Sequence, residues 1–513
     1  MIVHDRTRLI GPLRTIFPWK AHCTSSRAPH RTRLFSQKTE HLYYVAPRTR
    51  LYRTVVLFLE ALVDTLEKLE ILAEAAKYDV ACTSSGVRRG PKAGALGQAS
   101  PAGCCHSFTA DGRCVTLLKV LMSNACSYDC AYCVNRRGAS CKRATFSPRE
   151  LAELTVDFYK RNYIEGLFLS SGVLGTPDET TERMILCLEI LRGELCFNGY
   201  VHAKVIPGTS ADLVDRLGRL ADRLSVNLEL PSAKSLSLLC PDKGVNNVKA
   251  PMSQICSKRK QEEGALTGGH PSLPSRRSAS GVGLATNGAR LTLRKTSSVS
   301  SSKRTFAPAG QSTQIIIGAT PEDDNHILHL SSALYRRYDL KRVFFSAYMP
   351  VMEDDRLPGR ETPVPLRREH RLYQADWLMR YYDFSADELA SPDAPWLDLE
   401  VDPKLAWALA HIDRFPVEAN DAPLEALLRV PGIGPIGARR IIQARRRHPL
   451  GFDDLKRLNV TLKRARHFLT CHGKRDESCP LDEELIRKRV VSDASATSYN
   501  RRRRQAEGQL ALF

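Results

Sequence analysis

The sequence lacks any apolar run long enough to cross a lipid bilayer. Its clearest apolar run, residues 54–63, has ten positions and contains Glu60, whereas a spanning helix needs about 20 apolar residues. No secretory signal opens the chain. Fifteen cysteines among 513 residues are too sparse for a small extracellular scaffold built on disulfides. We therefore expect a cytoplasmic protein that has no membrane partner.

Acidic residues are scarce in four segments, and this scarcity accounts for the net charge of +20. Residues 1–53, 251–310, 429–475 and 487–504 carry +9, +8, +11 and +6, which leaves −14 for the rest of the chain. The basic character of the tails and of the 251–310 segment is typical of solvated chain. The +11 in residues 429–475 is packed into 47 positions and indicates a polyanionic partner.

A fourth cysteine is missing from the C-x3-C-x2-C motif formed by Cys126, Cys130 and Cys133. A structural zinc site needs four ligands, so a zinc site here requires a distant fourth one. Three thiolates can instead hold three irons of a 4Fe-4S cubane and leave the fourth iron open to bind and reduce a small molecule. We favour the cluster and keep the zinc knuckle as the alternative.

Strand-like and helix-like segments alternate after this motif. Strands are predicted at 115–122, 165–170, 200–206, 224–230, 313–318 and 342–348, and helices at 148–162, 178–193, 211–221 and 323–337. This alternation predicts an α/β protein with a parallel sheet and helices outside. Right-handed connections curve such a sheet toward a barrel, and functional residues then lie at the C-terminal ends of its strands.

The cysteine segment resembles the radical S-adenosylmethionine (SAM) superfamily. Residues 67–72, 162–172 and 371–377 extend the resemblance over about residues 66–471, to a bacterial family of radical SAM proteins labelled with DNA modification and repair. In the superfamily the open iron chelates SAM, and an electron cleaves SAM to a 5′-deoxyadenosyl radical that abstracts hydrogen from the substrate. The resemblance thus implies a partial (β/α)6 barrel, a 4Fe-4S cluster and SAM as cofactors, and an electron donor that the sequence does not identify.

The loop after the second strand is the place where the superfamily carries a Gly-Gly-Glu-type motif for the SAM amino group. This chain has Ser170-Ser171-Gly172 there, without an acid, although hydroxyl and carbonyl oxygens also accept hydrogen bonds from an ammonium group. Lys204 and Glu229, on later strands, are candidates for the SAM carboxylate or ribose; the alternative is an ion pair between them. The predicted SAM-binding residues are Tyr132, Ser170, Ser171, Gly172, Lys204 and Glu229.

The second strong motif lies at 427–447 and resembles a helix-hairpin-helix. Gly432 and Gly434 allow a tight turn and close approach of the backbone, with Ile433 supplying packing. A helix starting there presents free N–H groups to an anion such as a DNA phosphate, and Arg439 and Arg440 flank it. Contacts of this kind position DNA without reading its sequence. The alternative is an ordinary helical hairpin with a solvated basic face.

Together these features predict six segments: an N-terminal extension, the first part of the barrel, an unstructured basic insertion, the second part of the barrel with an extension, a helix-hairpin-helix domain and a basic tail. Their predicted bounds are 1–62, 63–255, 256–310, 311–400, 401–475 and 476–513. The favoured function is repair or modification of DNA by a radical SAM enzyme. The alternatives are an enzyme that modifies RNA such as tRNA, and a noncatalytic iron–sulfur protein that binds nucleic acid.

Overall fold

The computed structural model describes residues 64–76, 104–108, 114–267, 305–479 and 481–496. The predicted N-terminal extension and most of the predicted insertion lie outside the described residues, as does the end of the basic tail. No helix within the described ranges is long and apolar enough to span a membrane.

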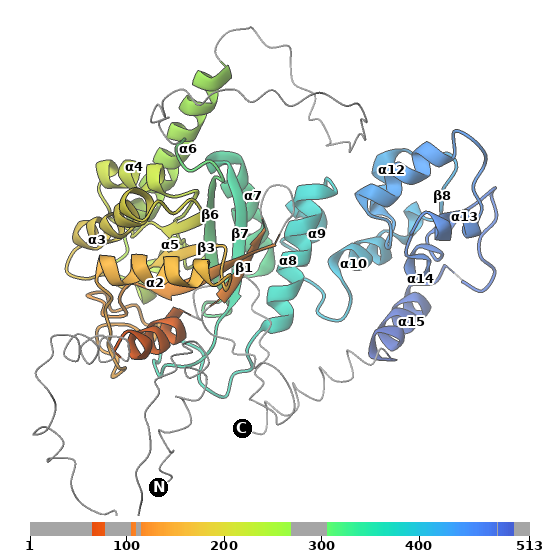
Figure 1. Ribbon diagram of the computed structural model, residues 1–513. Helices are drawn as coiled ribbons and strands as arrows, with labels where there is room; N and C mark the ends of the chain where they lie inside the picture. Colours follow the sequence, from red (N-terminus) through yellow and green to blue (C-terminus); the bar gives the residue numbers. More distant parts are fainter. Residues whose placement is uncertain (1–63, 77–103, 109–113, 268–304, 480, 497–513) are drawn as a thin grey trace, which may run out of the picture. The chain divides into compact units, whose positions relative to one another are not determined.

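A seven-stranded sheet forms the centre of the fold, with its strands ordered as they occur in the sequence (Figure 1). β2 to β7 are parallel, and β1 pairs with β2 in the antiparallel sense. The strands are β1 (Cys104–Phe108), β2 (Cys114–Leu121), β3 (Gly166–Ser170), β4 (Tyr200–Lys204), β5 (Arg223–Ser225), β6 (Gln311–Ile317) and β7 (Leu340–Ala347). The predicted partial barrel of six parallel strands is therefore confirmed, and β1 is an addition that the sequence pattern did not predict.

Helices connect the parallel strands and cover the sheet (Figure 1). They are α2 (Pro148–Lys160), α3 (Pro177–Glu189) continued by the π-helical turn η4 (Ile190–Glu194), α4 (Ala211–Leu220), α5 (Ala233–Leu239), α6 (Val245–Thr267) and α7 (Asp324–Tyr338), with α8 (Leu366–Tyr381) after β7. Ser147 and Thr176 start α2 and α3 with capping boxes followed by proline, which satisfies the first N–H groups of each helix. These caps fix where the loops after β2 and β3 end.

The fourth parallel strand is much shorter than the pattern at 224–230 predicts. β5 ends at Ser225, and pairing with β6 returns only in an isolated bridge between Glu229 and Ile315. Glu229 has a φ of +67°, a left-handed conformation that is uncommon for a residue other than glycine. The alternation of apolar residues in this segment correctly predicts that it is buried. It does not predict the left-handed backbone at Glu229, which kinks the segment.

Part of the segment predicted to be an unstructured insertion is helical. Helix α6 runs from Val245 to Thr267 and so includes residues assigned to the unstructured segment at 256–310. At the far end, Phe306 and Ala307 are fully or almost fully buried, with Phe306 packed into the barrel core. The Ser-, Arg- and Lys-rich composition hid both helical and core positions at the edges of this segment.

A second hydrophobic core follows the barrel. It is built from α10 (Pro403–Ala410), the short turn η5 (Ile412–Arg414), α11 (Leu424–Arg429), α12 (Pro435–Ala444), α13 (Phe452–Arg457), α14 (Leu462–Ala465) and α15 (Glu483–Ala496), together with the two-stranded parallel sheet of β8 (Val417–Glu418) and β9 (Leu469–Thr470). Between the barrel and this core lies α9 (Ala386–Leu389). Leu378 and Phe384, from the end of α8 and the residues after it, also pack into the second core.

Candidate active site and hairpin

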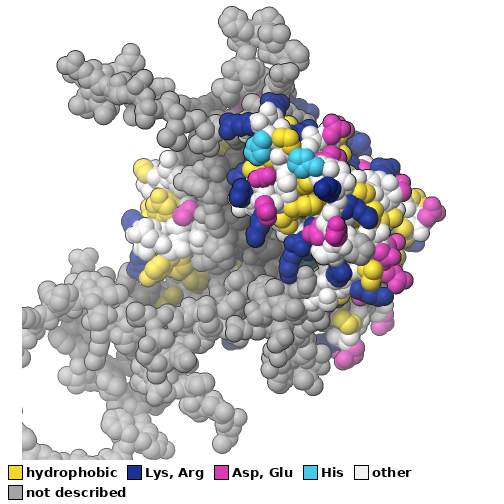
Figure 2. Space-filling model, turned by 90° about the vertical axis from the view of Figure 1, so that its right-hand side faces the viewer, with side chains coloured by type: hydrophobic (Ala, Val, Ile, Leu, Met, Phe, Trp, Pro, Cys, Tyr) yellow, Lys and Arg dark blue, Asp and Glu magenta, His cyan; other side chains and the backbone are white. Residues whose placement is uncertain are grey.

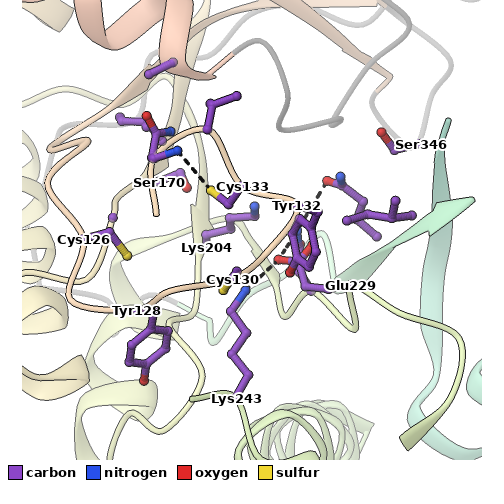
Figure 3. A pocket seen from close by; sticks show the side chains of 18 of the residues that line it. Cys126, Tyr128, Cys130, Tyr132, Cys133, Ser170, Lys204, Glu229, Lys243 and Ser346 are labelled. Atoms are coloured by element: carbon purple, nitrogen blue, oxygen red, sulfur yellow. Dashed lines mark hydrogen bonds and ion pairs between the residues drawn. The ribbon is translucent and has the colours of Figure 1, made fainter. Parts of the chain in front are cut away.

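A cavity of about 530 Å³ lies at the C-terminal ends of the parallel strands. This volume falls within the usual range for a small-molecule site. All nine residues predicted from the sequence to hold the cluster or SAM line it (Figure 3): Cys126, Tyr132, Cys130, Cys133, Ser170, Ser171, Gly172, Lys204 and Glu229. The fold thus brings the cysteine loop, the loop after β3 and the ends of β4 and β5 to one place.

The cysteine loop is held against the loop after β3 by backbone hydrogen bonds. The amide of Ser127 donates to the carbonyl of Val173 at 2.8 Å, and the amide of Val173 donates to Sγ of Cys126 at 3.4 Å. On the other side of the loop, the amide of Asn135 donates to Sγ of Cys133 at 3.4 Å. Amide donors therefore already point at two of the three sulfurs, and such bonds stabilise thiolate ligands.

Gly172 is required by packing between these two loops. Its amide donates to the carbonyl of Ser123 at 2.7 Å, and a Cβ built at Gly172 would collide with the carbonyl oxygen of Ala125. Because backbone occupies the space where a side chain would go, only glycine fits. The sequence analysis assigned Gly172 to SAM binding, and its close packing is a second reason for its identity.

The donor set of the cavity suits a thiolate-bound cluster. Cys130 is buried, and Cys126 and Cys133 are partly buried. Burial raises the pKa of the Cys133 thiol to about 12, so metal binding has to deprotonate this cysteine. The three cysteines line one cavity but do not form a ready-made metal site: among the residues that the structure describes, no group of three or more His, Cys, Asp or Glu side chains stands close enough together to hold a metal ion.

A buried ion pair crosses the floor of the cavity. Nζ of Lys243 lies 3.1 Å from Oε1 of Glu229, and only 12% and 11% of the two side chains are exposed. The side-chain amide of Asn227 also approaches Glu229 at 3.4 Å and Oε1 of Gln314 at 3.3 Å. The ion-pair partner of Glu229 in the structure is thus Lys243, a residue that the sequence analysis did not consider.

The segment from Leu239 to Lys243, which we call the clasp, is hydrogen-bonded to the cysteine loop. The carbonyl of Leu239 accepts a hydrogen bond from the amide of Ala131 at 2.8 Å, and Oδ2 of Asp242 accepts one from the amide of Asp129 at 2.9 Å. The cysteine within the clasp, Cys240, is fully buried. Each of these bonds joins positions more than 100 residues apart, so no local sequence pattern predicts the clasp.

Cys240 contacts two members of the predicted site. Its sulfur lies 3.2 Å from the hydroxyl of Tyr132, and its side chain packs in one cluster with Cys130. The neighbouring Cys240 side chain, together with burial, raises the pKa of the Cys130 thiol. A fourth sulfur therefore stands beside the C-x3-C-x2-C motif without belonging to it.

The cavity continues past the predicted SAM residues toward β7 and α8. Gln314, Ser346, Tyr348 and Glu369 line this part. Glu369 is held by the amide of Ala347, which donates to Oε2 at 2.6 Å, and burial raises the pKa of its carboxyl group. Sequence reasoning missed this polar group because its members are single residues on β6, β7 and α8 with no shared motif.

At the position of the predicted hairpin, two helices that pack together, α11 and α12, are joined by residues 430–434. Gly432 has a φ of +90°, and a Cβ there would lie 2.6 Å from the carbonyl oxygen of Thr461. Gly434 is the N-cap of α12. Ile433 is buried in the second core, so the turn is tight for the reason that the sequence indicates.

A buried lysine on α10 forms a hydrogen bond to the backbone of this turn. Nζ of Lys404, on α10, donates to the carbonyl of Ile433 at 2.5 Å and lies 4.7 Å from the centre of the Tyr382 ring. Only 7% of Lys404 is exposed. Burial lowers the pKa of its ammonium group to about 7. The hairpin turn is therefore joined to α10 by a hydrogen bond from the Lys404 amino group, which is largely shielded from water.

The surface near the hairpin carries charges of both signs. Arg439 and Arg440 are exposed on α12, and the exposed Ile436 lies one turn earlier with 66% of its surface accessible. Figure 2 shows Lys and Arg side chains spread over this side of the molecule with acidic side chains between them. Arg445 does not belong to a free basic face, because it donates to the carbonyls of Ala419 and Ala422 at 3.1 and 2.8 Å.

Comparison with known proteins gives only weak likenesses. No protein-family model and no curated protein sequence matches the chain. The solved structures similar to it include the FeFe-hydrogenase maturase HydG from Carboxydothermus hydrogenoformans (TM-score 0.33, 11% identity, 50% of each chain covered) and methylornithine synthase PylB (TM-score 0.33, 12% identity, 50% of this chain and 60% of that chain). A second structure of HydG covers 76% of this chain and 80% of its own, at TM-score 0.33 and 11% identity. The chain thus spans half the length of the first and 60% of the second.

Proposed function

We propose that the protein is a radical SAM enzyme. The observation that carries this proposal is that Cys126, Cys130 and Cys133 line one cavity at the C-terminal ends of six parallel strands. Three thiolates are the donor set that leaves one iron of a 4Fe-4S cluster open. When bound, the cluster supplies the electron that cleaves SAM to methionine and a 5′-deoxyadenosyl radical.

The other residues of the cavity supply binding groups for SAM. The hydroxyls and carbonyls of Ser170 and Ser171 provide acceptors for its amino group in place of an acid. Lys204 provides a cation for the carboxylate, Glu229 an acceptor for the ribose hydroxyls, and the backbone of Tyr132 a contact for adenine. The walls of the cavity carry both apolar and polar groups.

Cofactor chemistry tests this proposal directly. The anaerobically reconstituted full chain is incubated with dithionite and SAM, and 5′-deoxyadenosine is measured by chromatography. We expect cleavage by the wild type and none by Cys130→Ala; Cys196→Ala, at an exposed cysteine outside the cavity, is the matched control. Stoichiometric zinc in the motif, or an iron–sulfur spectrum that does not respond to SAM, overturns the proposal.

We further propose that the substrate is DNA and that the hairpin binds its backbone. Support comes from the +11 charge of residues 429–475 and from the start of α12 at Gly434, where free N–H groups favour a phosphate. The exposed Arg439 and Arg440 stand on the first turns of the same helix. These groups contact phosphate without reading bases, so the hairpin holds the substrate and the cavity performs the reaction.

Competition between nucleic acids separates the proposed substrate from its alternatives. Binding of labelled duplex DNA is measured at several salt concentrations against unlabelled DNA and tRNA, because phosphate contacts make affinity fall with salt. Stronger competition by DNA, together with transfer of deuterium from labelled nucleotides into 5′-deoxyadenosine, supports DNA modification. Stronger competition by tRNA supports an RNA-modifying enzyme. Tight binding with an intact cluster but no SAM cleavage identifies a noncatalytic binding protein.

A further inference from the structure

The clasp carries a positive charge into the cavity at the cysteine loop. Lys243 is its last residue, and its side chain runs along the cavity floor to the position of Cys130 (Figure 3). There its ammonium group pairs with Glu229 at 3.1 Å and lies beside Cys130 (Figure 3). A lysine that is 12% exposed has given up most of its hydration, which is costly unless nearby negative groups compensate.

Glu229 forms an ion pair with this charge. It is a single carboxylate on the opposite side of Lys243, held by a backbone kink with a φ of +67°. The kink is fixed from both sides, because the amide of Glu229 donates to Gln314 at 2.9 Å and its carbonyl accepts from Ile316 at 2.6 Å. The backbone thus holds the carboxylate in place, and the ammonium group lies between a fixed anion and a cysteine sulfur.

We propose that Lys243 tunes the reduction potential of the cluster held by Cys126, Cys130 and Cys133, an inference that rests on the proposed function. Reduction adds one electron, supplied by an external reductant, to a cluster that is already anionic through its thiolate ligands. A cation beside one of these sulfurs stabilises the reduced form more than the oxidised form, because the interaction grows with the negative charge. Lys243 therefore raises the potential, and Glu229 lowers it.

Hydrogen bonds hold the clasp, and with it Lys243, next to the cysteine loop. The hydrogen bonds from Ala131 to Leu239 and from Asp129 to Asp242 fix its backbone to the same loop that carries the cysteines. Lys243 is thus a positioning residue for charge and need not touch SAM or the substrate. Its effect must appear in the cluster alone, before SAM is added.

A potentiometric titration of the full chain, reconstituted anaerobically without SAM and followed by electron paramagnetic resonance, measures this effect. Removing the cation in Lys243→Met is expected to lower the ratio of reduced to oxidised cluster at a fixed potential about tenfold, which corresponds to a fall of about 59 mV in the midpoint potential for one electron. Glu229→Gln is expected to move the midpoint upward, and the double variant to lie between the two. Lys243→Arg keeps the charge and should stay near the wild type.

Lys234→Met is the matched control, because Lys234 is an exposed lysine on α5 that does not line the cavity. If Lys243→Met holds a full cluster and titrates like Lys234→Met, the inference is wrong while the proposed function stands. If Lys243→Met fails to hold a cluster, Glu229→Gln decides, and an unchanged midpoint there overturns the inference. A wild type that binds no iron–sulfur cluster overturns the proposed function itself.

Discussion

The cysteine cavity and the hairpin turn each contain a glycine packed against backbone and a buried lysine. They differ in how far apart in the sequence the residues that form them lie. The cavity joins Ala131 to Leu239 and Asp129 to Asp242, pairs of residues more than 100 positions apart in the chain. The hairpin is made from residues 424–444, with Lys404 and Thr461 as its outer supports. We therefore expect the cysteine cavity to depend on the complete barrel. The hairpin, by contrast, can be changed without disturbing the core of the barrel.

Gly172→Ala should produce the largest effect and should be confined to the cavity. Because the added Cβ collides with the carbonyl of Ala125, the cysteine loop has to move, at a cost of about 1–3 kcal/mol. We expect a large loss of bound iron, measured by metal analysis after reconstitution, with DNA binding unchanged. Gly193→Ala is the control, since a Cβ there meets nothing within 4 Å. Full iron loading by Gly172→Ala would show that the packing is dispensable.

Gly432→Ala is the matching change in the hairpin and should reverse the pattern. Its φ of +90° and the Thr461 carbonyl at 2.6 Å both disfavour a side chain, and the left-handed conformation alone costs about 1–2 kcal/mol. DNA affinity should fall at least tenfold, while SAM cleavage without DNA stays at the wild-type rate. Gly437→Ala, in the same helix with contacts only at 3.9 Å, should bind DNA normally. Equal loss of SAM cleavage in Gly432→Ala would mean that the two sites are coupled.

The strands and the hairpin could be predicted from the sequence because their signals are local. The run at 115–122 gives β2 at Cys114–Leu121, and the glycines around Ile433 give the turn between α11 and α12. The kink at Glu229 and the clasp at Leu239–Lys243 could not be predicted, since each depends on contacts made across the barrel. The cysteine spacing predicts the ligands, but the charged residues that surround them are brought together only once the chain has folded.

Lys404→Met tests whether burial of the Lys404 ammonium group beneath the hairpin turn lowers the free energy of unfolding. The pKa of Lys404 falls from 10.5 in the unfolded chain to about 7 in the fold, so the unfolded state binds more protons between these values. Stability of the wild type should therefore rise with pH from 7 to 10.5, by at most about 1.4 kcal/mol per pH unit from this group. In Lys404→Met this contribution is absent, so the difference between the two proteins in urea unfolding should change with pH. Parallel curves would show that the lysine does not titrate in this range.

Arg439→Gln and Arg440→Gln should have the smallest effects. Each removes one exposed cation near the start of α12, and a lost phosphate contact lowers the slope of log affinity against log salt by about 1. The weakening should be similar for all DNA sequences. Arg360→Gln, which changes an arginine that is 60% exposed and paired with Glu353, should leave the slope unchanged. A loss that depends on DNA sequence would assign base recognition to the hairpin.

The left-handed backbone at Glu229 restricts how this position can vary in related chains. Asparagine, aspartate and glycine adopt such a conformation at low cost, whereas valine and isoleucine do not. Replacement by aspartate keeps the kink and the charge but shortens the reach toward Lys243; replacement by asparagine or glycine keeps the kink and removes the charge. Substitutions at this position can therefore change the charge near Lys243 gradually, while the backbone conformation of the segment stays the same.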